Sequence, residues 1–100
     1  MNKQIFDSIT QLKRELIPDE RLILFGSQAR GDAHPGSDWD LLLLTEEKSN
    51  KDLEDKIYKF VLMGWDYGTY LSIKTYTVKD WHSHPSILRY NVEQEGIEIV

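Results

Sequence analysis

The stretch that decides the fold is LILFGSQARGDAHPGSDWDLLLLT, residues 22–45. Four apolar residues precede a Gly-Ser pair, a segment of small residues with one arginine, and a second apolar run that opens with the pattern Asp-x-Asp. Apolar runs bounded by glycine, proline and serine are typical of buried strands. The stretch therefore predicts a strand, a tight turn, a short helix and a second strand.

The Asp-x-Asp pattern places two carboxylates at the start of the second strand. Side chains two residues apart on a strand share a face, with Cα atoms roughly 6.5–7 Å apart. Asp38 and Asp40 should thus lie side by side, while Trp39 points to the other face. Two neighbouring carboxylates raise each other's pKa unless a cation lies between them. Because Mg²⁺ is commonly held by one or two carboxylates plus substrate phosphates, this pattern predicts a metal and nucleotide site.

The Gly26-Ser27 pair supplies the complementary half of that site. A glycine directly after a strand permits a positive φ and close approach of a ligand to the backbone. The N–H groups that open the next short helix can bind phosphate oxygens, and Ser27 adds a hydroxyl. Gly26 and Asp38 are twelve positions apart, enough for a short helix and a return loop into an adjacent strand. Phosphate donors and metal ligands are thus expected to face each other across one cleft.

These residues resemble the signature of a known superfamily. The pattern is Gly26-Ser27-x-Ala29-Arg30-Gly31 followed by Ser37-Asp38-x-Asp40-Leu41-Leu42. It is similar to that of the nucleotidyltransferases that include DNA polymerase beta, and most similar to the minimal nucleotidyltransferase (MNT) domains related to kanamycin nucleotidyltransferase. The motif covers about a fifth of the chain, and the length and element order of the remainder fit such a domain. The resemblance implies the nucleotidyltransferase fold.

The resemblance also implies a mechanism. In such enzymes the Asp-x-Asp pair and a third carboxylate on a later strand hold two Mg²⁺ ions roughly 3.5–4 Å apart. One ion activates the attacking hydroxyl, and the other binds the triphosphate of ATP or another NTP. Asp38 and Asp40 would be the catalytic and metal-binding residues, and Gly26 and Ser27 would bind the β- and γ-phosphates.

The sequence departs from this pattern at the third carboxylate. The strand expected to carry it, Thr69–Thr77, contains no Asp or Glu. Asp66 lies just upstream and would reach the site only if the chain bends there. Lys74 would place a fixed cation where the family has an anion. Nucleotide binding is therefore better supported by the sequence than catalysis.

Three residues of the motif have two interpretations each. Arg30 either binds phosphate or neutralises the aspartates in a structural role. Ser37 either bonds the backbone of the turn or contacts the triphosphate. Trp39 either packs in the core or stacks on a nucleotide base.

The composition limits the classes of partner. One hundred residues make one domain, residues 1–100, with a net charge of −5 and a pI near 5.1. This balance argues against nucleic-acid binding through a general basic surface. Cysteine is absent, so the chain has no disulfide or thiolate zinc site. No stretch approaches the ~20 apolar residues of a membrane span, and no apolar signal segment opens the chain. We expect a cytoplasmic protein.

Periodicity and capping signals predict the remaining elements. Helices are expected over residues 3–16, from a Ser49 cap to about Gly64, from a Thr77 cap through residue 84, and over 87–95; strands are expected over 21–25, 69–77 and 97–100. The predicted class is α/β, a small mixed β-sheet with helices packed mainly on one face.

Three functions fit these observations. The first is an active, partner-dependent nucleotidyltransferase, and the resemblance implies an antitoxin that adenylylates a HEPN-domain toxin. The second is an inactive module that binds nucleotide or the HEPN partner by contact alone. The third is a structural subunit whose aspartates bind nothing. The intact motif favours the enzyme, while the small size of the domain requires a partner protein or a second copy to supply the acceptor.

Overall fold

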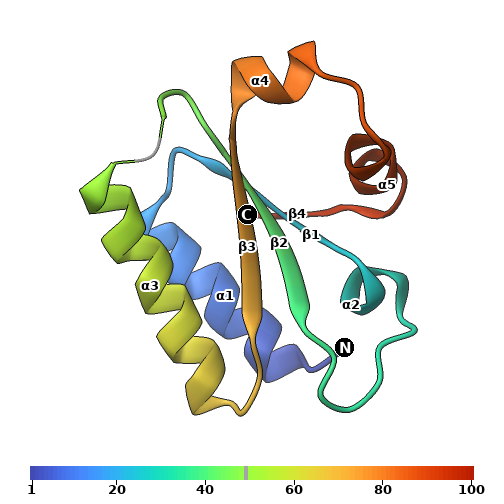
Figure 1. Ribbon diagram of the computed structural model, residues 1–100. Coiled ribbons are helices and arrows are strands. Elements are labelled where there is room, and N and C mark those ends of the chain that lie inside the picture. The colour runs from blue at the N-terminus through green and yellow to red at the C-terminus, as the bar shows by residue number, and fades with distance from the viewer. Residues whose placement is uncertain (49) are drawn as a thin grey trace.

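The structure is a computed structural model that describes residues 1–48 and 50–100. The described residues form five helices and four strands (Figure 1). In chain order they are α1 (Lys3–Leu16), β1 (Arg21–Phe25), α2 (Ser27–Arg30), β2 (Trp39–Thr45), α3 (Lys51–Asp66), β3 (Leu71–Thr77), α4 (Val78–Ser83), α5 (Ile87–Glu95) and β4 (Ile97–Ile99). None of the described helices is long and apolar enough to cross a membrane.

The four strands form one mixed sheet in the order β3-β2-β1-β4. β1 runs antiparallel to both of its neighbours, β2 and β4, whereas β2 and β3 are parallel. A parallel pair needs a long crossover connection, which α3 provides here. The predicted α/β class with a small mixed sheet is confirmed.

The two faces of the sheet are covered unequally. The two long helices, α1 and α3, lie side by side on one face, which we call the closed face (Figure 1). The shorter helices α4 and α5 pack against the other face, the open face, near β3 and β1 respectively. The expectation that helices pack mainly on one face therefore describes the long helices, and the open face carries a second, smaller layer.

Alternation along the strands divides the core between these faces. The closed-face core joins α1 and α3 to the sheet through Ile5, Ile9, Ile17, Leu22, Leu24, Trp39, Leu41, Leu43, Leu53, Phe60, Leu71 and Ile99. The open-face core is half that size and consists of Ile23, Phe25, Leu42, Leu44, Trp81 and Val92. Each central strand contributes to both cores because successive side chains point to opposite faces.

Helix α3 differs from its predicted bounds at both ends. The predicted cap Ser49 lies outside the described residues, and the described cap is Asn50, whose side chain accepts from the Leu53 N–H at 2.9 Å. The helix continues past Gly64 to Asp66. Gly64 does not end the helix; a Cβ there would come within 2.8 Å of Leu71, so this glycine permits close packing on the sheet.

The other boundaries match the predictions closely. Thr77 caps α4 as expected, accepting from the Asp80 N–H at 3.1 Å. β3 begins at Leu71 instead of Thr69, because Tyr67 and Gly68, the latter at φ 73°, form a turn after α3, and the Thr69 N–H still donates to the Gly64 carbonyl of that helix.

Candidate nucleotide site

The predicted phosphate-binding turn has the backbone conformation that requires glycine. Gly26 ends β1 and precedes α2 with φ 80° and ψ −160°, a region that is essentially restricted to glycine. The following turn is closed by the Arg30 N–H, which donates to the Gly26 carbonyl oxygen at 3.0 Å. The positive φ expected at Gly26 is confirmed.

Asp40 lies directly beside this turn. In the antiparallel register of β1 and β2, Phe25 is opposite Asp40, so the next residue of the chain, Gly26, is level with the start of β2. A Cβ on Gly26 would collide with the Asp40 carboxylate. The two halves of the expected site therefore meet at contact distance, and only the missing side chain of Gly26 leaves room for both.

Asp38 and Asp40 differ in how the fold holds them. β2 begins at Trp39, so Asp40 is on the strand but Asp38 is one residue before it; the prediction that both aspartates lie on the strand is wrong. The strand cannot include Asp38 because the loop from Asp32 is still turning at Ser37, whose N–H bonds the His34 carbonyl. Trp39 is 1% exposed and lies in the closed-face core. Of its two interpretations, packing in the core is therefore the one that the structure supports.

Burial and charge act together on Asp40. Burial raises the pKa of the Asp40 carboxyl above its ordinary value, and the charge of Asp38 raises that pKa further. The positive charges of Lys74 and Arg30 lower the pKa of Asp40 and offset part of the effect. A carboxylate in this position is stabilised by an added cation. Two aspartates with hard oxygen donors, one of them partly buried, fit a Mg²⁺ ion that is completed by phosphates.

A further carboxylate, Glu95 at the end of α5, reaches the same turn. Its Oε1 accepts a hydrogen bond from the Gly26 N–H at 2.9 Å. Its Oε2 lies 3.1 Å from Nη1 of Arg30, and the Glu95 side chain is only 17% exposed. Glu95 lies in the last helix, as its sequence pattern predicts, but no motif in the sequence assigns it a role. The position of Glu95 beside the turn follows from the pairing of the short final strand with β1. The sequence predicts that strand, but no sequence pattern identifies its partner in the sheet.

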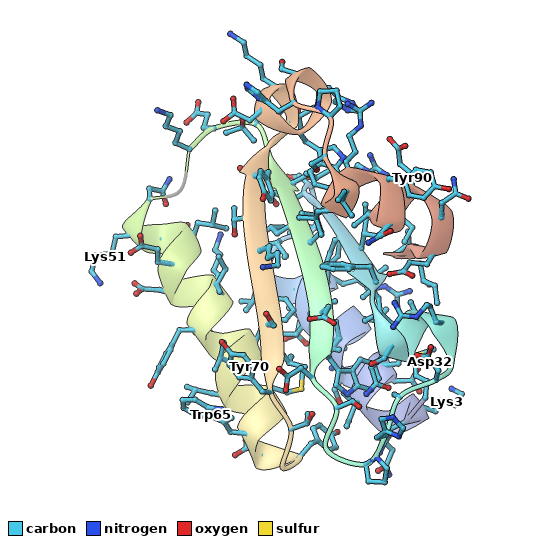
Figure 2. The ribbon with its side chains drawn as sticks, turned by 45° about the vertical axis from the view of Figure 1, so that its right-hand side comes forward. Lys3, Asp32, Lys51, Trp65, Tyr70 and Tyr90 are labelled. Atoms are coloured by element: carbon cyan, nitrogen blue, oxygen red, sulfur yellow. The ribbon has the colours of Figure 1, made fainter. Side chains whose placement is uncertain are left out.

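Arg30 and Ser37 have partners within the described chain. Arg30 pairs with Asp32, Nε to Oδ2 at 3.1 Å, and with Glu95; it influences Asp40 through space without an ion pair to it. The Ser37 hydroxyl accepts from the His34 N–H at 2.8 Å, as the turn-bonding interpretation expects. Figure 2 labels Asp32, the partner of Arg30, on the side of β2 opposite Tyr70.

No carboxylate lies where the resemblance implies the third metal ligand. The parallel register places Ser72 beside Asp40 and Lys74 beside Leu42, on the same face of the sheet. Asp66 lines a hollow between α1 and α3, which cover the other face. Across residues 1–48 and 50–100, no three Asp, Glu, His or Cys side chains form a group that could hold a metal ion.

The family model for the nucleotidyltransferase domain matches residues 5–88, from α1 into α5. The chain belongs to the nucleotidyltransferase domain family. The residues that the match spans include the Gly26 turn, Asp38 and Asp40, but they end before Glu95. The Gly26 turn and the two aspartates therefore lie within the matched region, and Glu95 lies beyond it.

Curated relatives resemble parts of the chain. A bifunctional uridylyltransferase/uridylyl-removing enzyme of Pseudoalteromonas translucida is 47% identical over 49 residues, which are 49% of this chain and 6% of the enzyme. The corresponding enzyme of Cupriavidus metallidurans is 29% identical over 92 residues, 79% of this chain and 11% of the enzyme. The chain thus spans about a tenth or less of these relatives.

Solved structures share the fold. A chain from a toxin-antitoxin crystal structure with AMP-PNP matches with a TM-score of 0.63 and 20% identity, covering 95% of this chain and 72% of that one. A chain from the structure of a tri-AMPylated Shewanella oneidensis HEPN toxin in complex with an MNT antitoxin matches with a TM-score of 0.61 and 19% identity, over 100% and 72%. The nucleotidyltransferase fold is confirmed.

Proposed function

We propose that residues 1–100 act as a single minimal nucleotidyltransferase domain of the antitoxin type. It would transfer a nucleoside monophosphate from ATP or another NTP to a hydroxyl of a HEPN-domain partner protein. Family membership supports the reaction class, and likeness to chains from toxin-antitoxin structures supports the partner. The observation that carries the proposal is the contact between the Gly26 turn and Asp40, because phosphate donors and a cation-binding carboxylate then share one site.

In this proposal each residue of the motif has a separate task. The backbone N–H groups of Gly26 and Ser27 and the Ser27 hydroxyl donate to the β- and γ-phosphates, while Arg30 adds a positive charge. Asp38 and Asp40 hold Mg²⁺. When bound there, Mg²⁺ would neutralise charge on the phosphates and make the acceptor hydroxyl oxygen a better nucleophile. Ser37 keeps the loop before Asp38 in place through its bond to His34.

The reaction exchanges a phosphoanhydride bond for a phosphoester bond. The hydroxyl oxygen of the acceptor forms a bond to the α-phosphorus. The bond from the α-phosphorus to the oxygen that bridges to the β-phosphate breaks, and pyrophosphate leaves with that electron pair. The hydroxyl proton passes to water. The chain contributes positioning and charge, which are the main protein contributions in reactions of this type.

The open face explains why a partner is required. Its small core leaves the site end of the sheet at the surface, where Asp40 and Ser72 are only partly buried and Lys74 is exposed. Water must be excluded from the site for efficient transfer. We infer that a HEPN partner, or alternatively a second copy of this chain, covers this end of the sheet and brings the acceptor hydroxyl.

One observation favours a second function, an inactive module that binds nucleotide or partner. Ser72 and Lys74 occupy the part of β3 where the resemblance implies a third carboxylate. The Lys74 ammonium repels a second cation, so the site holds one Mg²⁺ more readily than two. Under this alternative the chain binds the nucleotide and its HEPN partner without transfer.

Calorimetric titration of ATP into the protein tests the nucleotide site. We expect saturable binding in Mg²⁺ that is lost in EDTA and falls at least tenfold in Asp38→Asn/Asp40→Asn. A matched double variant, Asp52→Asn/Asp55→Asn, removes the same charge from α3, where these carboxylates are 79% and 63% exposed. It should bind as the wild type does. Absence of binding at millimolar ATP in the wild type, and also after removal of the Glu95 carboxylate, would overturn the proposal.

Transfer itself separates the two functions. The protein is incubated with ATP, Mg²⁺ and a co-purifying HEPN partner, and the partner is analysed by intact mass spectrometry. Addition of a nucleoside monophosphate that disappears in Asp38→Asn/Asp40→Asn supports the enzyme. An unmodified partner that remains bound to the chain supports the inactive module.

A further inference from the structure

The donors assigned to phosphate in the proposed function already have an anionic partner within the protein. Glu95 accepts from the Gly26 N–H at 2.9 Å and contacts Arg30 Nη1 with both oxygens, at 3.2 and 3.1 Å. A carboxylate and a phosphate use the same kinds of donor, a backbone N–H and a guanidinium. Both anions cannot occupy these donors at once.

Sheet register, and not a loop, brings Glu95 to this position. In the antiparallel pair of β1 and β4, Leu24 is opposite Ile97. Continuing this register by two residues past the Leu24–Ile97 pair brings Gly26 opposite Glu95. The end of α5 is also packed tightly on β1, because a Cβ on Gly96 would come within 2.8 Å of the Ile23 side chain. The backbone that carries Glu95 is thus fixed relative to the turn.

The Glu95 side chain can leave without moving that backbone. Three rotatable bonds separate the carboxylate from the backbone, and 17% of the side chain is already exposed. Arg30 would retain a second anionic partner, Asp32, at 3.1 Å. Displacement of Glu95 therefore costs the bonds to Gly26 and Arg30 and leaves the helix in place.

We propose that Glu95 is an internal competitor for the phosphate site and that a nucleotide must displace its carboxylate to bind. This inference rests on the proposed function and adds a residue that sets nucleotide affinity. Loss of the negative charge would strengthen nucleotide binding. The opposite effect, weaker binding, would mean that Glu95 assists the ligand, for example as a metal ligand in place of the missing third carboxylate.

The test compares three variants with the wild type by calorimetric titration of ATP in Mg²⁺. Glu95→Gln removes the charge but keeps an oxygen that can accept from Gly26, whereas Glu95→Ala removes both. We expect ATP binding about tenfold tighter for Glu95→Gln, the worth of one charge-assisted hydrogen bond, and tighter still for Glu95→Ala. The matched control Glu93→Gln removes an exposed carboxylate of α5 that pairs with Arg89, and it should leave the affinity unchanged.

A second measurement reports on the contact without nucleotide. In ¹H–¹⁵N spectra of the free protein, the Gly26 amide proton should move upfield in Glu95→Ala and stay in place in Glu93→Gln, because only the first loses a hydrogen bond. Addition of ATP and Mg²⁺ to the wild type should shift the same resonance. This readout also shows that each variant is folded.

The outcomes distinguish the two proposals. Tighter binding in both Glu95 variants supports the competition, including the case in which only these variants bind ATP. Equal or weaker binding in the Glu95 variants, with a wild type that binds ATP, overturns the competition and leaves the proposed function standing. If none of the four proteins binds ATP, the nucleotide site itself is wrong.

Discussion

The two faces of the sheet divide the tasks of this small domain. The closed face lies under two helices of 14 and 16 residues, and its core contains twelve buried residues. The open face lies under helices of 6 and 9 residues and has a core of six. The residues of the candidate site, Asp40 and Glu95 among them, belong to the end of the open face at the Gly26 turn.

This difference shows how a chain of 100 residues can carry a polar site. A domain of this size buries little surface beyond what it needs to fold. Concentrating apolar contacts on the closed face lets the open face hold partly buried charges that oppose folding. β2 belongs to both faces, because its successive side chains point in turn to the closed-face core and to the open face that carries the site.

The largest expected effect contrasts neighbours on β2 that face opposite ways. Leu41 and Leu42 are both 0% exposed, but Leu41 lies in the closed-face core and Leu42 in the open-face core. Leu41→Ala should lower the free energy of unfolding by about 4 kcal/mol, and Leu42→Ala by about 2–3 kcal/mol, because the short helices of the open face can relax into the cavity. Urea unfolding measures both values, and equal losses would contradict the division of tasks.

A smaller effect is expected at the two glycines that flank α2. Gly26→Ala forces a side chain into a glycine-only conformation and against Asp40. It should cost about 2–3 kcal/mol of unfolding free energy and abolish ATP binding. Gly31 also has a positive φ, but a Cβ there meets nothing within 4 Å. Gly31→Ala should therefore cost about 1 kcal/mol and keep ATP binding.

The smallest effect concerns the charge of Asp40 in the absence of metal. Since its pKa is raised in the folded protein, mainly by burial, the folded state binds the proton more tightly than the unfolded chain. The contribution of protonated Asp40 to the stability of the folded protein is complete below the ordinary pKa of 3.8. It is lost as the pH rises through the raised pKa of the folded state. Asp40→Asn should therefore stabilise the protein at neutral pH, by about 0.5 kcal/mol at this partly exposed site.

Thermal unfolding in EDTA from pH 3.5 to 7.5 checks this sign. The wild type should lose stability relative to Asp40→Asn as the pH rises. Asp7→Asn, which removes an exposed carboxyl from α1, is the control and should run parallel to the wild type. A destabilised Asp40→Asn at neutral pH would show that the carboxylate is structurally required, and the contrast between the faces would fail.

Local patterns were sufficient to predict most of the fold. Apolar spacing predicted α1 over residues 3–16 and β1 over 21–25, and the Thr77 cap marked the start of α4. Each of these signals depends on residues close in sequence. The extension of α3 past Gly64 was missed because this glycine serves a contact with Leu71, and a contact between distant segments leaves no local pattern.

The candidate site was predictable in its first half only. Gly26, Asp38 and Asp40 lie within fourteen positions of one another, so their spacing alone predicted a turn beside a carboxylate. Glu95 comes from the last helix, and its place depends on which strand pairs with β4. The pairing of β4 with β1 buries Ile99 in the closed-face core. This contact joins distant segments, so no sequence motif predicts it. The roles of the motif residues remain predictions for the experiments above.

The pairing of β1 with β4 has a consequence for design. One residue inserted in an extended conformation between Glu95 and Ile97 would move the end of α5 by about 3.3 Å along β1. The number of residues between α5 and β4 therefore sets the position of the Glu95 carboxylate relative to the turn. Variants that change this number by one would alter the charge at the turn without replacing any amino acid in it.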